Sequence, residues 1–237
     1  MATTLNLQDI LYDKNYECPV CQNTFYSKSI RTGKNQVTST DRDLYSHYSV
    51  VNPLLYEVLS CPDCGYTALA KTFETLLPTQ IKWIQEQMVS KYKKRPFSAY
   101  TSVHEALTKH QLALACCIIK KGKIGEQAYI CLHIAWLYRD LKDEEGEKLY
   151  LKKALDGFKK ALETENFPIF SLDALTTTYI ISAIAYDLKD YATAKSYLSE
   201  VLYSSTGQLK NRALDLKQLI YEAENETTNK IEDTIEN

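Results

Sequence analysis

The sequence has no apolar run long enough to cross a membrane, and its N-terminus, MATTLNLQDILYDKN, lacks a basic start followed by an apolar core. These absences predict a protein with neither a transmembrane segment nor a secretory signal, which we expect to be soluble and cytoplasmic. The chain also lacks an excess of one charge, because 28 Lys and Arg face 30 Asp and Glu for a net charge of −2. That balance excludes a bulk attraction to nucleic acid or to acidic membranes.

Motifs of the common enzyme classes are also absent. There is no P-loop, no dinucleotide-binding glycine pattern, no nucleophile elbow and no H-E-x-x-H. His104, His110 and His133 are isolated, without an i, i+4 partner, so ordinary surface or core roles are expected for them. Asp41 and Asp43 allow an acid/base interpretation, but strand alternation or capping after Thr40 explains them equally well. The sequence therefore predicts no catalytic residue and no enzyme activity.

Cysteine is unevenly placed in the chain. Of seven cysteines, four form two C-P-x-C knuckles, Cys18-Pro19-Val20-Cys21 and Cys61-Pro62-Asp63-Cys64. The other three, Cys116, Cys117 and Cys131, lie in helical patterns, where cysteine behaves as a small hydrophobic residue. This odd set predicts no disulfide framework, which fits a cytoplasmic protein.

The two knuckles predict a metal site. Paired C-x-x-C motifs supply the four thiolates that tetrahedral structural zinc requires. Catalytic zinc usually has three protein ligands and an open position, so Cys18, Cys21, Cys61 and Cys64 predict one structural Zn²⁺ and no catalytic one. His47 is a distant candidate to replace one ligand. A redox role for one C-x-x-C is the alternative.

The local sequence also predicts the shape of this module. Proline stiffens each knuckle, and Gly65 supplies a permissive dihedral after the second, where the first offers Asn23 as a residue that tolerates a left-handed conformation. Residues 22–60 separate the pairs by more than the usual 15–20 positions, which requires a hairpin or insertion. Helical patterns are predicted over 67–76 and 79–94. Knuckle, hairpin and helix together predict a treble-clef-like or zinc-ribbon-like α+β module.

Residues from about 98 to 224 read as successive amphipathic helices separated by short polar breaks, which forces antiparallel neighbours. The stretch 179–194 resembles a tetratricopeptide repeat, with Ser182 and Ala194 at the small positions where two helices pack closely. A weaker copy begins near Ala135, with Glu147 where a small residue is expected. The fold class is therefore mainly α, and we predict three parts: a zinc-binding module with trailing helices over 1–96, tetratricopeptide-like helical hairpins over 97–225, and an acidic, disordered tail over 226–237.

One stretch resembles a known family. The first knuckle is followed by Asp43, Tyr48, the segment Asn52-Pro53-Leu54-Leu55-Tyr56-Glu57-Val58 and then Cys61-Pro62-Asp63-Cys64-Gly65-Tyr66. In combination these motifs resemble the uncharacterised bacterial family catalogued as domain of unknown function 2225. The resemblance implies a cytoplasmic bacterial zinc-binding protein with tetratricopeptide-like helices, and it supplies no catalytic residues.

From these features we expect a non-catalytic interaction protein whose helical groove binds an unknown protein partner. The first alternative is a nucleic-acid-binding zinc module that uses the basic cluster Lys91–Arg95, although cations at a helix C-terminus are already favoured by the helix dipole. Between Cys18 and Cys64 the charges balance, and four thiolates with one Zn²⁺ make that segment negative, so nucleic acid is the weaker prediction. The second alternative is a thiol or zinc redox sensor.

Overall fold

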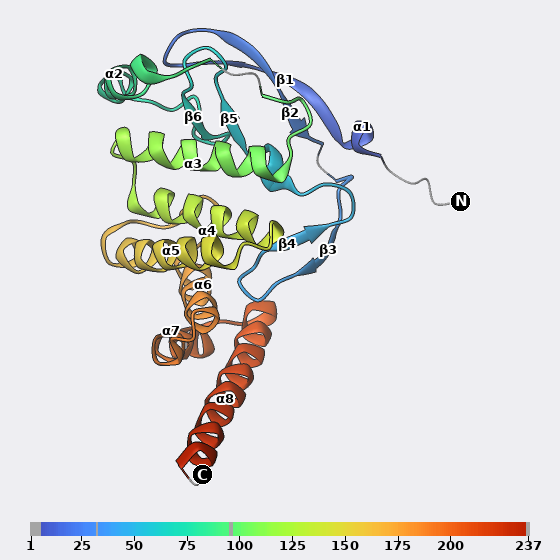
Figure 1. The fold of residues 1–237 in the computed structure, drawn as a ribbon, viewed down its shortest axis with the longest axis vertical. Helices are drawn as coiled ribbons and strands as arrows, with labels where there is room; N and C mark the ends of the chain where they lie inside the picture. The colour runs from blue at the N-terminus through green and yellow to red at the C-terminus, as the bar shows by residue number, and fades with distance from the viewer. Residues whose placement is uncertain (1–5, 32, 95–96, 236–237) are drawn as a thin grey trace.

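The computed structural model describes residues 6–31, 33–94 and 97–235. Within them, the first part is built from three two-stranded antiparallel sheets and the rest from a stack of helices (Figure 1). The strands are β1 (Leu11–Glu17), β2 (Thr24–Ile30), β3 (Val37–Thr40), β4 (Ser46–Tyr48), β5 (Val58–Ser60) and β6 (Thr67–Leu69). The α-helices are α1 (Leu7–Ile10), α2 (Pro78–Gln87), α3 (Val103–Ile119), α4 (Ile124–Asp140), α5 (Glu144–Thr164), α6 (Ala174–Asp187), α7 (Tyr191–Ser204) and α8 (Gly207–Ile235). Two 3₁₀ turns, Pro53–Tyr56 and Val89–Lys91, complete the list.

Two of the three sheets carry the knuckles. Strands β1 and β2 pair from Leu11↔Ile30 to Glu17↔Thr24, and the first knuckle forms the turn between them. Strands β5 and β6 pair from Val58↔Leu69 to Ser60↔Thr67 around the second knuckle. Each cysteine pair therefore lies at the tip of its own hairpin.

The prediction of a helix over 67–76 is wrong. Thr67–Leu69 is strand β6, all three of its residues are buried, and the next helix, α2, begins at Pro78. Leu69, Phe73 and Leu76 recur at i, i+4 and i+7, which suits a helix face, but pairing with β5 and burial on both faces prevail at Thr67–Leu69. No helix starts at the second knuckle, so the structure lacks the helix that the treble-clef alternative requires there.

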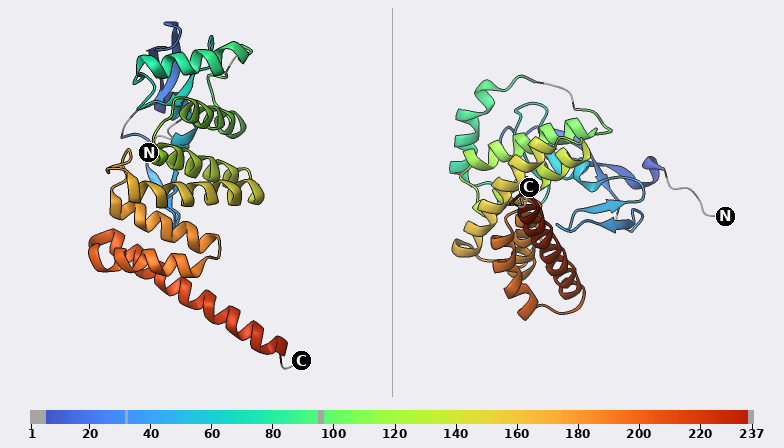
Figure 2. Two further views of the ribbon diagram at one scale, coloured as in Figure 1. Left: turned by 90° about the vertical axis from the view of Figure 1, so that its left-hand side faces the viewer. Right: turned by 60° about the horizontal axis from the view of Figure 1, so that its bottom comes forward.

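The helices stack one behind another, and short turns reverse the chain between them (Figures 1 and 2). Side-chain caps start α3, α5, α6 and α7, where Ser102, Asp143, Asp173 and Asp190 each accept a hydrogen bond from a backbone N–H three residues on. Three of the turns place a lysine in the left-handed region, with φ of 53° at Lys121, 59° at Lys142 and 63° at Lys189. These turns make antiparallel neighbours of α3 and α4, α4 and α5, and α6 and α7.

Small residues set the closest helix approaches. Ser182 on α6 and Ala194 on α7 are both fully buried, and the Ser182 hydroxyl donates to the Ala194 carbonyl at 2.7 Å. In the α4–α5 pair the close approach falls at Gly146, where a Cβ would lie 2.4 Å from the Tyr138 ring. The neighbouring Glu147, expected to occupy a small position, instead accepts from Arg139 Nε at 2.7 Å.

A segment of the N-terminal part lies along the helical stack. Tyr45 stacks on Trp136 of α4 at a centroid distance of 5.0 Å, and its hydroxyl donates to Asp140 at 2.6 Å. Farther along, the Tyr179 hydroxyl of α6 donates to the Arg42 carbonyl at 2.9 Å. The β3–β4 region therefore packs in cis against helices that follow it by about a hundred residues or more in the chain.

Helix α8 extends beyond the predicted end of the helical region. It runs to Ile235, over most of the stretch expected to be a disordered acidic tail, and residues 236–237 lie outside the described residues. No proline or glycine follows Gly207, and Glu and Lys are good helix formers, so nothing in the sequence stops the helix. Among the described residues, no helix is long and apolar enough to cross a membrane.

Candidate metal centre

The two knuckles share one backbone geometry. In the first, the Cys18 N–H donates to the Asn23 carbonyl at 2.9 Å and the Gln22 N–H donates to the Cys18 carbonyl at 2.9 Å. In the second, the Cys61 N–H donates to the Tyr66 carbonyl at 2.8 Å and the Gly65 N–H to the Cys61 carbonyl at 3.0 Å. Identical turns orient the two thiols of each pair toward the same side.

The residue after each knuckle takes the left-handed conformation. Gly65 has φ +77°, as its sequence predicts, but the first knuckle uses Gln22 at φ +62° and not Asn23. Gln22 stands at the position equivalent to Gly65, and its side-chain amide donates to the Pro19 carbonyl at 3.3 Å. Gly65 has a second reason to be glycine, because a Cβ there would lie 2.3 Å from the ring of Tyr92.

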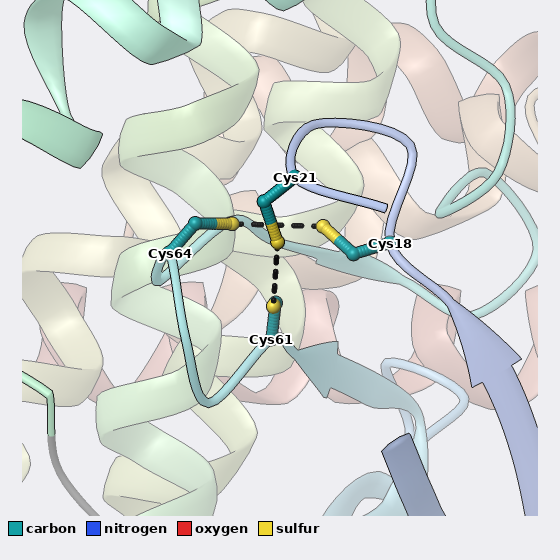
Figure 3. A group of neighbouring side chains, drawn as sticks. All are labelled: Cys18, Cys21, Cys61 and Cys64. Carbon is teal, nitrogen blue, oxygen red and sulfur yellow. Dashed lines mark hydrogen bonds between the residues drawn. The ribbon is translucent and has the colours of Figure 1, made fainter. Parts of the chain in front are cut away.

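The four cysteine sulfurs converge on one point (Figure 3). Cys18 and Cys64 lie 3.5 Å apart, Cys21 and Cys61 also 3.5 Å, and all four sulfurs lie within 4.8 Å of one another. Thiolates bound at about 2.3 Å to a tetrahedral zinc lie about 3.8 Å apart, whereas a disulfide requires about 2.0 Å. All seven cysteines are free thiols. The Cys18, Cys21, Cys61 and Cys64 group is therefore compatible with a zinc site.

Crowding of the four thiols perturbs their ionisation. Hydrogen bonding from Cys18 and Cys64 lowers the pKa of the Cys61 thiol to about 2, and backbone N–H groups of Cys64 and Asp63 act in the same direction. The shared hydrogen bond with Cys61 raises the pKa of Cys18 to about 12, and the pKa of Cys64 is raised through its hydrogen bond with Cys18. A bound divalent cation stabilises all four thiolates, which is the chemistry of a structural zinc ligand set.

The centre lies in a small core of its own. Cys18, Cys61 and Cys64 are buried, whereas Cys21 is exposed. The core around them is aromatic and aliphatic, and α3 contributes Cys116 to it; its other members are Tyr16, Val20, Phe25, Leu59, Tyr66, Ala68, Phe73 and Ile84. At the rim, Lys94 of the basic cluster pairs with Asp63 at 2.8 Å. Arg95 of that cluster lies outside the described residues.

The other residues singled out in the sequence do not join the group of four sulfurs, although Cys116 packs in the same core. His47 contacts Asp41 at 2.8 Å, so it replaces no cysteine ligand. Asp43 is buried and accepts from Trp136 at 2.7 Å and from Arg139 at 2.7 Å, which makes it an anchor between β3–β4 and α4. Cys116, Cys117 and Cys131 are buried, as expected of small hydrophobic residues.

The structure also brings together three residues that the sequence separates: Glu57 before β5, His110 on α3 and His133 on α4. One ligand atom of each lies within 4.8 Å of the others. Burial opposes ionisation of Glu57, but attraction to His133 outweighs it and lowers the Glu57 pKa to about 2. Burial lowers the pKa of His110 to about 4. The spacing of these three residues in the sequence does not predict that they come together, because they belong to three different elements.

Comparison with known proteins places the chain in a family without assigning an activity. A family model described as "Uncharacterized protein conserved in bacteria (DUF2225)" matches residues 11–223, and it confirms the resemblance inferred from the knuckles and the segment between them. An uncharacterized protein of Borreliella burgdorferi is 22% identical over 152 residues, which cover 56% of this chain and 54% of that protein. The chain thus spans about half the length of this relative. No solved structure matches. Because the family model spans most of the sequence, the chain belongs to the bacterial family DUF2225.

Proposed function

We propose that this protein is a zinc-stabilised interaction scaffold, in which one structural Zn²⁺ joins the two knuckle hairpins and tetratricopeptide-like helical hairpins bind a protein partner. The observation that carries the proposal is the convergence of the four cysteine sulfurs within 4.8 Å at the tips of two otherwise separate hairpins. Four thiolates fill a tetrahedral zinc and leave no position for a substrate. The metal then has an architectural role, and the free thiols of all seven cysteines fit a cytoplasmic location.

Metal content tests the first half of the proposal. The purified full chain, prepared without chelator, should hold zinc at the four-cysteine centre, and cobalt in its place should give intense thiolate-to-metal charge-transfer absorption. A Cys61→Ser, Cys64→Ser variant should lose both. A matched Cys131→Ala variant, which changes a buried thiol of α4 outside the centre, should keep both. A wild-type protein without charge-transfer bands after cobalt loading would refute the zinc role.

The interaction role rests on the helices. The close α6–α7 contact through Ser182 and Ala194 follows the packing of a tetratricopeptide hairpin, which supports that reading. At the C-terminal end of the stack, α7 and α8 expose the aromatic side chains of Tyr203, at 93% of its surface, and Tyr221, at 62%. A hollow of about 230 Å³ beside Tyr221 is lined by Leu198, Leu202 and Ile220. We propose that this hollow takes an apolar side chain from a partner polypeptide.

Site-specific photo-crosslinking tests that role. A photoreactive residue in place of Tyr203 should capture a defined partner in cells, whereas the same residue in place of exposed Lys160 on α5 should not. Capture that is equal at both positions, or absent from both, would contradict partner binding through α7 and α8.

One observation favours a second candidate, a thiol or zinc redox sensor. Cys21 is exposed while the other three ligands are buried, so an oxidant can reach one sulfur of the centre directly. Such a sensor should release zinc under mild oxidation and recover it on reduction. Zinc retention under oxidant concentrations that modify exposed thiols elsewhere would remove this candidate. For nucleic acid the described residues offer no comparable observation, and Lys94 is paired with Asp63.

A further inference from the structure

A group of one half-buried carboxylate and two buried imidazoles lies between the β5–β6 hairpin and the first two helices of the stack. His133 Nδ1 is 2.9 Å from the Glu57 carboxylate, and the His110 and His133 rings lie 6.0 Å apart. His110 is completely buried and His133 is 3% exposed. Burying three such groups together is unfavourable unless each finds a partner.

Two of the ring nitrogens have no hydrogen-bond partner. His110 Nδ1 lies 2.8 Å from the Ala106 carbonyl, which can only accept, so Nδ1 carries the proton and Nε2 keeps its lone pair. That Nε2 is buried and unpartnered. Nδ1 of His133 is also buried and makes no hydrogen bond, but the Glu57 carboxylate lies 2.9 Å from it and pairs with the ring when His133 is protonated. The ligand atoms of the two histidines and of Glu57 lie within 4.8 Å of one another.

The surroundings of the group match those of a metal ligand set. Metal-bound histidine usually donates its second ring N–H to a carbonyl or carboxylate, as His110 donates to Ala106. The other oxygen of Glu57 is approached by the Tyr129 hydroxyl at 3.4 Å, which holds the carboxylate in place. Two histidines and one carboxylate bind Fe²⁺ or Zn²⁺ with coordination positions left open.

Those open positions face a cleft. A cavity of about 620 Å³ is lined by Glu57 and His133 together with Tyr48, Tyr129 and Lys71. A ligand of this size and lining is a small molecule, and an ion at the Glu57 carboxylate would lie on the wall of the cavity. The four-cysteine centre has no such access to a ligand through an open coordination position.

We propose that Glu57, His110 and His133 form a second metal site, which holds a divalent transition-metal ion with its open coordination positions toward this cleft. The second site shares no ligand with the proposed zinc centre, but the two sites are joined in the fold. Strand β5 leads directly from Glu57 to Cys61, so the knuckle that holds one metal also positions a ligand of the other. The open positions take water or an oxygen ligand bound in the cleft.

The test uses the full chain with its cysteine centre filled by one equivalent of Zn²⁺, followed by titration with Co²⁺ alone under anaerobic conditions. One further equivalent of Co²⁺ should bind and give weak visible bands without thiolate charge transfer. In the same sample, NMR signals of the His110 and His133 rings should shift strongly through the paramagnetic ion. The ring signal of exposed His104, also on α3, should shift far less, because it is about 9 Å farther along the helix and has no bond to the ion.

Variants then assign the ligands. Glu57→Gln and His110→Gln should each weaken Co²⁺ binding by more than about 100-fold, since loss of a mere supporting group costs about 10–100-fold. His104→Gln is the matched control and should bind as the wild type does. Glu57→Gln preserves size and shape, so it keeps the test valid if the buried His110 variant fails to fold. A zinc-loaded wild type that takes up no Co²⁺, or Co²⁺ binding that Glu57→Gln leaves unchanged, would overturn the proposal.

Discussion

The knuckle hairpins and the helical stack are held together by different means. Each knuckle lies in a hairpin of two short strands, and an isolated two-stranded hairpin is marginal at best in water. The small core around the cysteines includes Cys18, Cys61 and Cys64 themselves among its few members, whereas Cys21 is exposed. The helices behind it bury a continuous core that extends from α3 to α8. On the proposed function, a metal stabilises the region where hydrophobic area is short, and packing stabilises the region where it is ample.

Two of the places where the two regions meet carry charged or ionisable side chains. At one, Asp43 and Arg139 tie β3–β4 to α4. At the other, Glu57 meets His110 and His133. The boundary is therefore the part of the molecule where polar chemistry is buried, which is where function is most often found. Five changes test how far the two regions are independent.

The largest effect should come from removing two zinc ligands. Cys61→Ser with Cys64→Ser should unfold the knuckle hairpins, because structural zinc contributes about 10–16 kcal/mol to small metal-binding peptides. Helices α4 to α7 should keep most of their circular dichroism. Complete unfolding of the chain would show that the stack depends on the metal as well, and the Cys131→Ala variant controls for loss of a buried thiol.

The next largest loss of stability should come from breaking the ion pair between Asp43 and Arg139. Arg139→Met leaves the carboxylate of Asp43, only 1% exposed, without its charged partner and should cost about 3–5 kcal/mol of unfolding free energy. Urea denaturation gives the value. Adding Asp43→Asn should recover part of the loss, and a double variant as unstable as the single one would show that the ion pair is not the cause.

A cavity in the stack should affect stability without affecting the metal. Phe158 of α5 is fully buried, so Phe158→Ala should lower the unfolding free energy by about 3–5 kcal/mol. Zinc content should remain that of the wild type. A loss of zinc in this variant would contradict the separation of the two regions.

Stability of the stack should also depend on pH through Asp187. Burial, followed by repulsion from Asp43, raises the pKa of Asp187 to about 6 from an ordinary value near 3.8. The folded chain therefore holds a proton that the unfolded chain has lost, and stability should fall as pH rises from about 4 to 6, by up to about 3 kcal/mol. Asp187→Asn should remove this fall, as urea denaturation across that range would show; an unchanged pH profile would contradict it.

The smallest effect should come from the first knuckle. Gln22 adopts φ +62°, which costs a non-glycine residue about 1–2 kcal/mol, so Gln22→Gly should stabilise the hairpin by about 1 kcal/mol or less. Thermal denaturation of the zinc-loaded chain measures the shift. The reverse change in the second knuckle, Gly65→Ala, should destabilise, since the new Cβ meets the Tyr92 ring.

Local sequence predicted much of this architecture. The C-P-x-C pairs predicted that four sulfurs converge, and helical periodicity with short polar breaks predicted the antiparallel helices. The strand at Thr67–Leu69 was missed because its three residues are buried on both faces, which removes the alternation that marks a strand. The left-handed lysines at 121, 142 and 189 were not predicted either, because backbone hydrogen bonds that close each helix C-terminus hold a conformation that a lysine side chain does not favour.

The second group of potential ligands could not be predicted. Glu57, His110 and His133 come from three elements, and each alone looks like an ordinary core or surface residue. Only the docking of the β5–β6 hairpin onto α3 and α4, through Val58, Leu69 and Ala113 among others, brings them together. Long-range contacts of this kind leave no periodicity or spacing in the sequence.

Hydrogen exchange of the full chain, with zinc bound and after its removal by a chelator, tests the central claim most directly. We expect amide protection in β1–β2 and β5–β6 to be lost with the metal, while α4 to α7 keep theirs. Protection of the knuckle hairpins that is unchanged without zinc would contradict a structural metal at Cys18, Cys21, Cys61 and Cys64.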